Sequence, residues 1–246
     1  MRILIANDDG IYSPGILALA EVAATFGDVR IVAPDVEQSS MGHAITASRP
    51  LLYKKTPIKN FEAYRVNGTP ADCVALGAYN WEKVDLVLSG INLGTNLGNA
   101  TWHSGTLAAA KQAVPLGMRG IAFSTSVTKA EPDFEKLKPF VKQVLDMVLE
   151  DKELHLINVN LPYDPQGLMW TKQSIRQYDG KIIPGEDPMG REHFWFTVIP
   201  LDETEQGTDR WAMKQGLVSI TPLRLDLTNE KELGYARKKY SSFQPK

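Results

Sequence analysis

Apolar runs and amphipathic segments alternate from the start of the chain. Residues 2–6 (RILIA) and 29–34 (VRIVAP) are short apolar runs followed by polar, glycine or proline residues, a pattern typical of buried strands. Between them, apolar side chains recur at helical spacing from Ile16 to Phe26, after Pro14. A strand, a helix and a strand within about 30 residues predict a βαβ unit with parallel strands and a right-handed crossover.

The same alternation continues to residue 162. Thr69 is a candidate N-cap and is followed by Pro70, so a helix is expected to begin there. Pro139 lies inside another helical pattern, and we expect it to interrupt or restart that helix because proline lacks a backbone donor. The pattern predicts further strands at 51–55, 62–66, 84–90, 120–125 and 154–162, and further helices at 69–80, 104–117 and 133–150.

The helical pattern ends after residue 162, and β-like segments follow, such as 193–200 (HFWFTVIP) and 216–223 (GLVSITPL). We therefore predict an α/β fold: a Rossmann-like, doubly wound, mainly parallel sheet with a β-rich C-terminal extension. Residues 1–162 are expected to form the α/β core and residues 163–246 the β-rich C-terminal region, as parts of one overall domain.

The amino-acid composition argues against several classes of protein and of binding site for this sequence: general nucleic-acid binders, disulfide or zinc frameworks, and membrane-spanning proteins. The 246 residues carry a formal net charge of -2, which gives no general field to attract nucleic acid or anionic lipid. The single cysteine, Cys73, excludes an internal disulfide and a cysteine-rich zinc framework. The sequence shows no signal-peptide pattern, and its apolar runs are shorter than a membrane span, so we expect a cytoplasmic protein.

Polar side chains follow several of the predicted strands. Asp8 and Asp9 end the first strand, Ser39 lies in the loop after the second, and Asn92 follows the strand at 84–90. The carboxyl ends of parallel strands meet at one edge of a sheet, where ligands bind. Two carboxylates, a hydroxyl and an amide supply only oxygen ligands, which suit Mg²⁺, Mn²⁺ or Ca²⁺ better than zinc. From the residues alone, a turn with solvated charges remains the alternative.

The segment 103–111 (HSGTLAAAK) is the second candidate element. Ser104 is a natural N-cap, and Gly105 and Thr106 begin a helix whose free N–H groups suit a phosphate. An ordinary capped helix is the alternative, although the preceding glycine-rich loop favours close approach to a ligand. His43 and His103 flank these segments and are candidates for an acid, a base or hydrogen-bonded loop residues.

Several familiar motifs are absent from the sequence. No G-x-G-x-x-G follows the first strand, so a Rossmann-type dinucleotide site is unsupported. There is no G-x-x-x-x-G-K-[ST], which excludes a P-loop NTPase, and no G-x-S-x-G elbow, which excludes the ordinary α/β-hydrolase.

Seven segments resemble, in order, the blocks of the survival protein SurE family. They are ILIANDDGIYSPGI, APDVEQSSMGHAIT, VNGTPADCV, LVLSGINLGTNLG, HSGTLAAA, NVNLP and GLVSITPLRLDLT, and they run from residue 3 to about residue 228. The resemblance implies a metal-dependent phosphatase that acts on nucleoside 5′- and 3′-monophosphates. It also implies a dimer or tetramer in which subunits exchange a C-terminal arm.

The resemblance also assigns residues. One divalent metal ion, Mg²⁺ or Mn²⁺, is implied at Asp8, Asp9, Ser39 and Asn92, with Asp8 and Asp9 as the catalytic pair. The phosphate pocket is implied at Asn96, Ser104, Gly105 and Thr106. Two mechanisms stay open at this point, namely attack by a metal-activated water and attack by Asp8. The functional alternatives are a broad acid phosphatase or exopolyphosphatase, and a non-catalytic nucleotide-binding module.

The chain departs from the family pattern beside the phosphate segment. Asn99 and Ala100 stand where acidic residues are common, His103 replaces a tyrosine, and Ser40 replaces a frequent glycine. Because histidine titrates near neutrality, His103 is expected to affect substrate preference and pH optimum.

Overall fold

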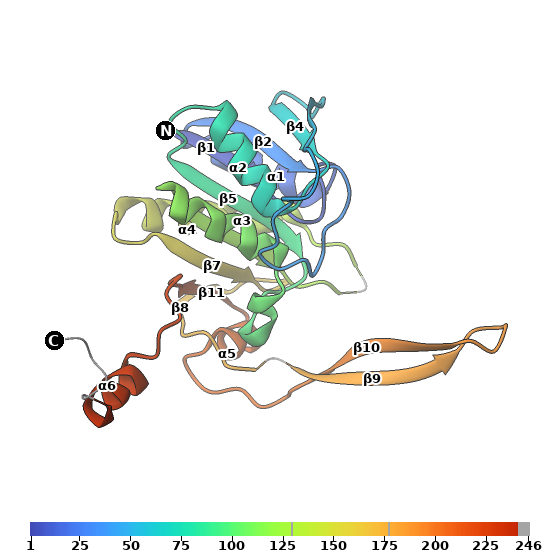
Figure 1. The fold of residues 1–246 in the computed structure, drawn as a ribbon. Coiled ribbons are helices and arrows are strands. Elements are labelled where there is room, and N and C mark those ends of the chain that lie inside the picture. Colours follow the sequence, from blue (N-terminus) through green and yellow to red (C-terminus); the bar gives the residue numbers. More distant parts are fainter. Residues whose placement is uncertain (129, 177, 241–246) are drawn as a thin grey trace.

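A nine-stranded sheet runs through the molecule (Figure 1). The computed structural model describes residues 1–128, 130–176 and 178–240. The strands of the sheet are β1 (Arg2–Ala6), β2 (Asp28–Pro34), β3 (Tyr53–Lys55), β4 (Glu62–Val66), β5 (Leu86–Leu93), β6 (Arg119–Thr125), β7 (Leu156–Leu161), β8 (Gly167–Trp170) and β11 (Leu217–Pro222). Their order is β3-β4-β2-β1-β5-β6-β7-β11-β8. All neighbours from β4 to β7 are parallel, whereas β3 is antiparallel to β4 and β11 to β7.

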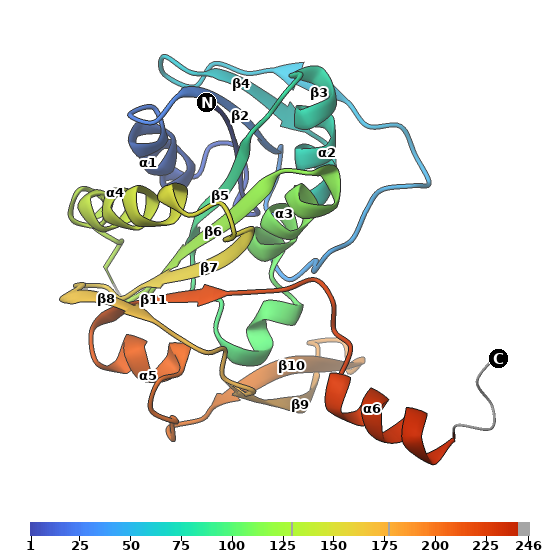
Figure 2. The ribbon, with the colours of Figure 1, turned by 90° about the vertical axis from the view of Figure 1, so that its left-hand side faces the viewer.

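Helices cover both faces of this sheet. The helices of the described residues are α1 (Pro14–Ala23), α2 (Pro70–Asn80), α3 (Gly105–Ala113), α4 (Phe134–Glu150), α5 (Asp209–Lys214) and α6 (Glu230–Lys239), with short 3₁₀ helices η1 (Gly98–Trp102) and η2 (Val114–Leu116), and α6 lies away from the sheet. Figure 2 shows α1 and α4 on one face and α2 and α3 on the other. Strand β1 serves both layers, because Ile3 and Ile5 belong to the α1/α4 core while Leu4 and Ala6 belong to the α2/α3 core. The predicted doubly wound α/β fold is confirmed.

The strand order reverses direction next to β1. The chain first builds β2 and β4 on one side of β1, and then returns to place β5, β6 and β7 on the other side. The loops that follow β1 and β5 therefore diverge from adjacent strands at one edge of the sheet. Such a switch point leaves a crevice at the carboxyl ends of the strands, and this is where the predicted polar side chains lie.

Helix α4 differs from its prediction. It runs without a break over Phe134–Glu150, although Pro139 lies inside it. Asp133 caps the helix by accepting hydrogen bonds from the N–H groups of Glu135 and Lys136. Pro139 is on the exposed side, while the opposite side, including Val141, is fully buried against the sheet. The buried face thus outweighs the single backbone hydrogen bond that the proline removes.

The region after residue 162 is continuous with the sheet. Strand β11 pairs with β7 in antiparallel register and with β8 in parallel register, and so extends the sheet beyond β7. Two further strands, β9 (Tyr178–Glu186) and β10 (Glu192–Pro200), form a separate antiparallel hairpin that projects from the body (Figures 1 and 2). None of the helices in the described residues combines the length and apolarity needed to cross a membrane.

Candidate active site

The loop after β1 folds back on itself at the switch point. The Asn7 side-chain amide donates a hydrogen bond to the carbonyl of Gly10 at 2.9 Å, and Gly10 has a φ of 95°, which favours glycine. Between them, Asp8 is buried, with 4% of its surface exposed, and Asp9 is partly buried. The turn therefore presents the two adjacent carboxylates at the carboxyl end of β1.

Helix α3 fixes the Asp8 carboxylate. The Thr106 hydroxyl donates a hydrogen bond to Asp8 Oδ1 at 2.7 Å. Gly105 brings the helix N-terminus against the same side chain, because a Cβ at Gly105 would lie 2.7 Å from Asp8 Cβ and 2.9 Å from Asp8 Oδ2. Asp8 is thus positioned directly at the positive end of the α3 dipole.

Strand β5 fixes the Asp9 carboxylate. The backbone N–H of Leu93 donates a hydrogen bond to Asp9 Oδ2 at 3.1 Å. This contact joins the loop after β1 to the end of β5 across the switch point. Asp9 also lines a neighbouring hollow together with Ser39, whereas Asp8 lines the main pocket. The two carboxylates therefore lie at the boundary between two cavities.

Burial disfavours the ionised form of both carboxyl groups. Desolvation raises the pKa of Asp8 above its ordinary value, despite the hydrogen bond from Thr106. Desolvation and the neighbouring Asp8 charge raise the pKa of Asp9 to about 7. The Glu37 carboxylate acts in the same direction on both groups, and no basic residue among those described offsets them. The hydrogen bonds from Thr106 and Leu93 therefore compensate the negative charge of the pair only in part.

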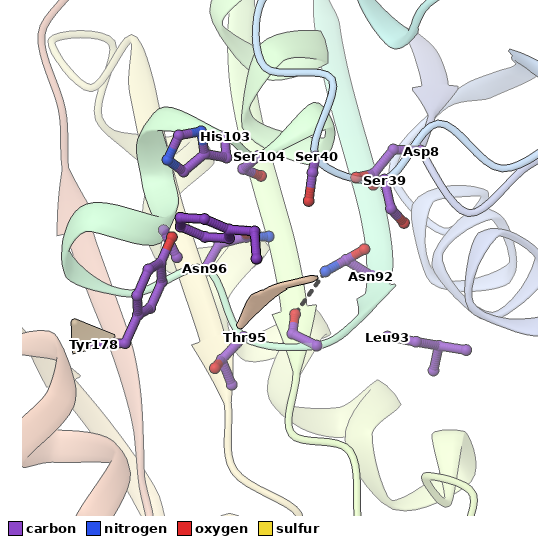
Figure 3. Close-up of a pocket in the computed structure, with 13 residues that line it drawn as sticks. Asp8, Ser39, Ser40, Asn92, Leu93, Thr95, Asn96, His103, Ser104 and Tyr178 are labelled. Carbon is purple, nitrogen blue, oxygen red and sulfur yellow. Dashed lines mark hydrogen bonds between the residues drawn. The ribbon is translucent and has the colours of Figure 1, made fainter. Parts of the chain in front are cut away.

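The remaining predicted oxygen donors gather around Asp8 in a pocket of about 600 Å³. Asn92 donates through its side-chain nitrogen to the carbonyl of Gly94 at 2.6 Å, which leaves its side-chain oxygen on the side of Asp8 and Ser39 (Figure 3). The Ser39 hydroxyl donates to Glu37 Oε1 at 2.6 Å and keeps its oxygen lone pairs. Asp8, Ser39 and Asn92 line one pocket, and Asp9 adjoins it.

This donor set fits a hard divalent cation. Two desolvated carboxylates next to neutral hydroxyl and amide oxygens match the ligands of Mg²⁺ and Mn²⁺. No group of three or more His, Cys, Asp or Glu side chains capable of holding a metal occurs in the described part of the chain, so zinc-type coordination is unsupported there. A bound cation would remove the electrostatic penalty that raises both carboxyl pKa values.

The predicted phosphate residues divide into two groups. Ser104 and Asn96 line the pocket (Figure 3). Ser104 is the N-cap of α3, and its hydroxyl accepts a hydrogen bond from the N–H of Leu107 at 3.0 Å. Gly105 and Thr106 are buried behind them, where they support Asp8. The helix N-terminus is therefore directed at the pocket, with its first residues packed on the candidate metal site.

A buried amide network that the sequence analysis missed holds Asn96. The Asn96 N–H donates to Asn160 Oδ1 at 2.8 Å, and the Asn158 side chain donates to the Asn96 carbonyl at 2.8 Å. The Asn96 side-chain nitrogen donates to Ser124 Oγ at 2.8 Å. Asn158 and Asn160 alternate with apolar residues in β7, and this polar pattern within an otherwise apolar strand was the available signal.

Residues of the C-terminal region hold the loop that follows Asn96 in place. One of them, Asp209, was not identified from the sequence. Asp209 is fully buried and accepts hydrogen bonds from the N–H of Gly98 at 3.0 Å and of Ser174 at 2.9 Å. Gln173 donates to the Gly98 carbonyl at 3.0 Å. These contacts anchor η1, whose following residue, His103, lines the pocket. His43 instead hydrogen-bonds Gln112 at 2.8 Å and lines a different hollow.

We expect the metal-free protein to lose stability as the pH rises from about 4 to about 7, because the folded-state pKa of Asp9 is raised to about 7. Across this range the unfolded chain releases a proton that the folded chain retains, so deprotonation favours unfolding. Asp9→Asn removes this titration. In EDTA its Tm should exceed that of the wild type at pH 8, with the difference shrinking towards pH 4, as scanning calorimetry can measure. A difference in Tm that does not change with pH would contradict this assignment.

Comparisons with known proteins agree on one family. The family model described as "Survival protein SurE" matches residues 3–180. A relative from Thermus thermophilus, 5′-nucleotidase SurE 1, is 46% identical over 235 residues, covering 93% of each chain. The 5′-nucleotidase SurE of Deinococcus radiodurans is 42% identical, covering 95% of this chain and 90% of that one. The crystal structure of a SurE protein from Aquifex aeolicus superposes with a TM-score of 0.84 at 38% identity, covering 97% and 99% of the two chains.

Proposed function

Because this chain belongs to the survival protein SurE family, we propose that it hydrolyses nucleoside 5′-monophosphates to nucleoside and inorganic phosphate. It is an enzyme of the 5′-nucleotidase class, and nucleoside 3′-monophosphates are further candidate substrates. The observation that carries the proposal is the position of Asp8, a desolvated carboxylate packed against the N-terminus of α3. A phosphate next to this carboxylate requires a cation between the two negative groups.

We assign that cation to one divalent metal ion, Mg²⁺ or Mn²⁺, with Asp8, Asp9, Ser39 and Asn92 as its ligands. When bound, the ion supplies positive charge and Lewis acidity at the phosphoryl oxygens. Thr106 and Leu93 orient the two carboxylates by the hydrogen bonds already described. The Asn92 side-chain amide is likewise held in one orientation, because its nitrogen donates a hydrogen bond to the Gly94 carbonyl.

The phosphate is bound by the other half of the pocket. Ser104, the N-cap of α3, lines this half of the pocket, and the positive end of the helix dipole favours the negative charge of the anion. The Asn96 side chain is held in one orientation by Ser124, so binding costs little side-chain entropy there. In the water-attack mechanism, we assign acceptance of the water proton to a carboxylate of the Asp8–Asp9 pair; in the alternative, Asp8 itself attacks phosphorus.

The proposal also includes a homo-oligomer, a dimer or tetramer. The β9–β10 hairpin projects from the body and exposes Met189 and Trp195 by 78% and 65%. An isolated two-stranded ribbon is marginally stable, and exposed apolar side chains of this size mark interaction surfaces. A second copy of the chain, exchanging its C-terminal arm, would cover them.

The test is release of inorganic phosphate from nucleoside 5′- and 3′-monophosphates in Mg²⁺, in Mn²⁺ and in EDTA. We expect release that depends on the metal and is faster on nucleotides than on p-nitrophenyl phosphate or polyphosphate. Equal or faster release from the last two would instead identify a broad acid phosphatase or exopolyphosphatase. Nucleotide binding without release, by folded protein in every metal, would identify a binding module and overturn the proposal.

A further inference from the structure

The pocket that holds the candidate metal ligands extends to the base of the projecting hairpin. Tyr178, the first residue of β9, and Phe196, in β10, line it together with Asp8, Asn96 and Ser104. Figure 3 shows Tyr178 across the pocket from Asp8 and Ser39. The pocket therefore has a polar side for the metal and phosphate and an aromatic side contributed by residues far along the chain.

Tyr178 and Phe196, the aromatic pair, lie on the same face of the hairpin. Phe196 is opposite Ile182 in the antiparallel register, and Ile182 is an even number of residues from Tyr178. Side chains alternate between the two faces of a strand, so this register places both rings on one face. The alternate residue Trp195 belongs to the other face, beside His193.

A glycine makes room for one of these rings. The Phe196 ring lies across Gly180 on the neighbouring strand, where a Cβ would approach its Cζ to 2.9 Å and its Cε2 to 3.1 Å. Glycine weakens a strand interior and is found where another group approaches the backbone closely. Phe196 nevertheless remains 66% exposed and lines the pocket. One side of its ring therefore packs on Gly180, and the rest is accessible from the pocket.

The aromatic pair is tied to the phosphate side of the site. The Asn99 side chain donates a hydrogen bond to the Tyr178 carbonyl at 3.3 Å, and Asn99 belongs to η1. Asp209 anchors the same 3₁₀ helix through the N–H of Gly98. The start of the hairpin and the loop after Asn96 are therefore held together as one wall of the pocket.

We propose that Tyr178 and Phe196 form the nucleobase subsite of this pocket, stacking on the base while the phosphate is held at α3. The inference rests on the proposed nucleotidase function. It adds the residues that bind the base of the nucleotide, which the proposed function does not specify. A volume of about 600 Å³ is ample for more than a phosphate group. Stacking uses the face of the ring, which every base has, so the subsite accepts all bases and favours the larger purines.

The test compares two substrates that differ only in the base, adenosine 5′-monophosphate and ribose 5-phosphate. For Phe196→Ala and for Tyr178→Ala, kcat/KM on adenosine 5′-monophosphate should fall about 10- to 100-fold, mainly through KM, as expected for loss of a base–aromatic stack. Turnover of ribose 5-phosphate should be unchanged. The matched control is Phe194→Ala, which removes an equally exposed ring that lies farther along the hairpin and outside the pocket.

A binding measurement separates this inference from the function on which it rests. Adenosine has a base but no phosphate, and we expect its calorimetric affinity to fall in Phe196→Ala and to be retained in Phe194→Ala. Equal losses on both phosphate substrates, or no loss on either, would overturn the subsite. If the wild type released no phosphate at all, the nucleotidase would fail, and adenosine binding would still decide the subsite.

Discussion

Asp8→Asn should abolish useful turnover, with kcat/KM falling by about 10²- to 10³-fold, the size of effect that losing one charge-stabilising group in an active site produces. Asparagine keeps the shape of the side chain, and its oxygen can still accept the Thr106 hydroxyl hydrogen bond, so the main change is the loss of the charge. Without that charge, the proposed cation would lose a negatively charged ligand. Steady-state phosphate release at saturating Mg²⁺ or Mn²⁺ measures the loss.

The fold of the Asp8→Asn protein should be intact. Burial opposes ionisation of Asp8, so the neutral amide should leave Tm in EDTA unchanged or higher. Addition of Mn²⁺ should raise the Tm of the wild type and not that of the variant. The matched control is Asp146→Asn on the exposed side of α4, where the aspartate forms an ion pair with Lys142. Activity of Asp8→Asn within tenfold of the wild type would remove Asp8 from the mechanism.

Gly105→Ala should lower kcat/KM by about 10²-fold, because displacing a catalytic group by about 1 Å costs this much. The added methyl group would lie 2.7 Å from Asp8 Cβ and 2.9 Å from Asp8 Oδ2, so either the aspartate or the start of α3 must move. Movement of either one separates the carboxylate from the helix N-terminus. Because alanine favours helix more than glycine does, the loss of activity should not reflect weaker helix formation.

The control for Gly105→Ala is the same substitution at Gly234. In α6 a Cβ at Gly234 would meet no heavy atom of the same subunit within 4 Å, so this variant should leave the pocket of its own subunit and its activity unchanged. For Gly105→Ala we also expect a higher metal concentration for half-maximal activity. Full activity at ordinary metal concentrations would show that α3 and Asp8 need not touch as the structure places them.

The central fold could be predicted because its signals are local. Apolar runs, helical periodicity and the Thr69 cap each arise within a few residues, and the capping box of Thr69 and Asp72 is present in the structure. The prediction for Pro139 was wrong because the burial of the helix face that outweighs it comes from the sheet. Local propensity carries no information about that distant surface.

Part of the candidate site could be inferred from strand ends alone. Asp8 and Asn92 follow neighbouring parallel strands, so topology is enough to bring them to one pocket. The hydrogen bonds of Ser39 to Glu37 and of Asp9 to Leu93 depend on loop conformation, which spacing does not determine. Side-chain partners in loops follow from three-dimensional packing, and the sequence gives only their residue types.

The supporting groups were missed for a different reason. Asp209 and Tyr178 lie in a region without regular periodicity, and their contacts with the loop at Gly98 and Asn99 span 111 and 79 residues of sequence. A single sequence contains no signal for such pairings. Asn158 and Asn160 were visible as polar residues in an apolar strand, but only the structure shows that both bind the backbone of Asn96.

The anchoring of Gly98 by Asp209 has a consequence for the order in which the enzyme matures on the ribosome. Strands β1 and β5, with the proposed metal ligands at their ends, are synthesised early. The loop beside them is secured only after Asp209 has emerged, 111 residues after Gly98. Strand β11, which covers the outer side of β7, is made later still. A nascent chain therefore carries its acidic centre without a finished pocket until Asp209 and β11 have been made, and we expect competence to cleave nucleotides only after that point.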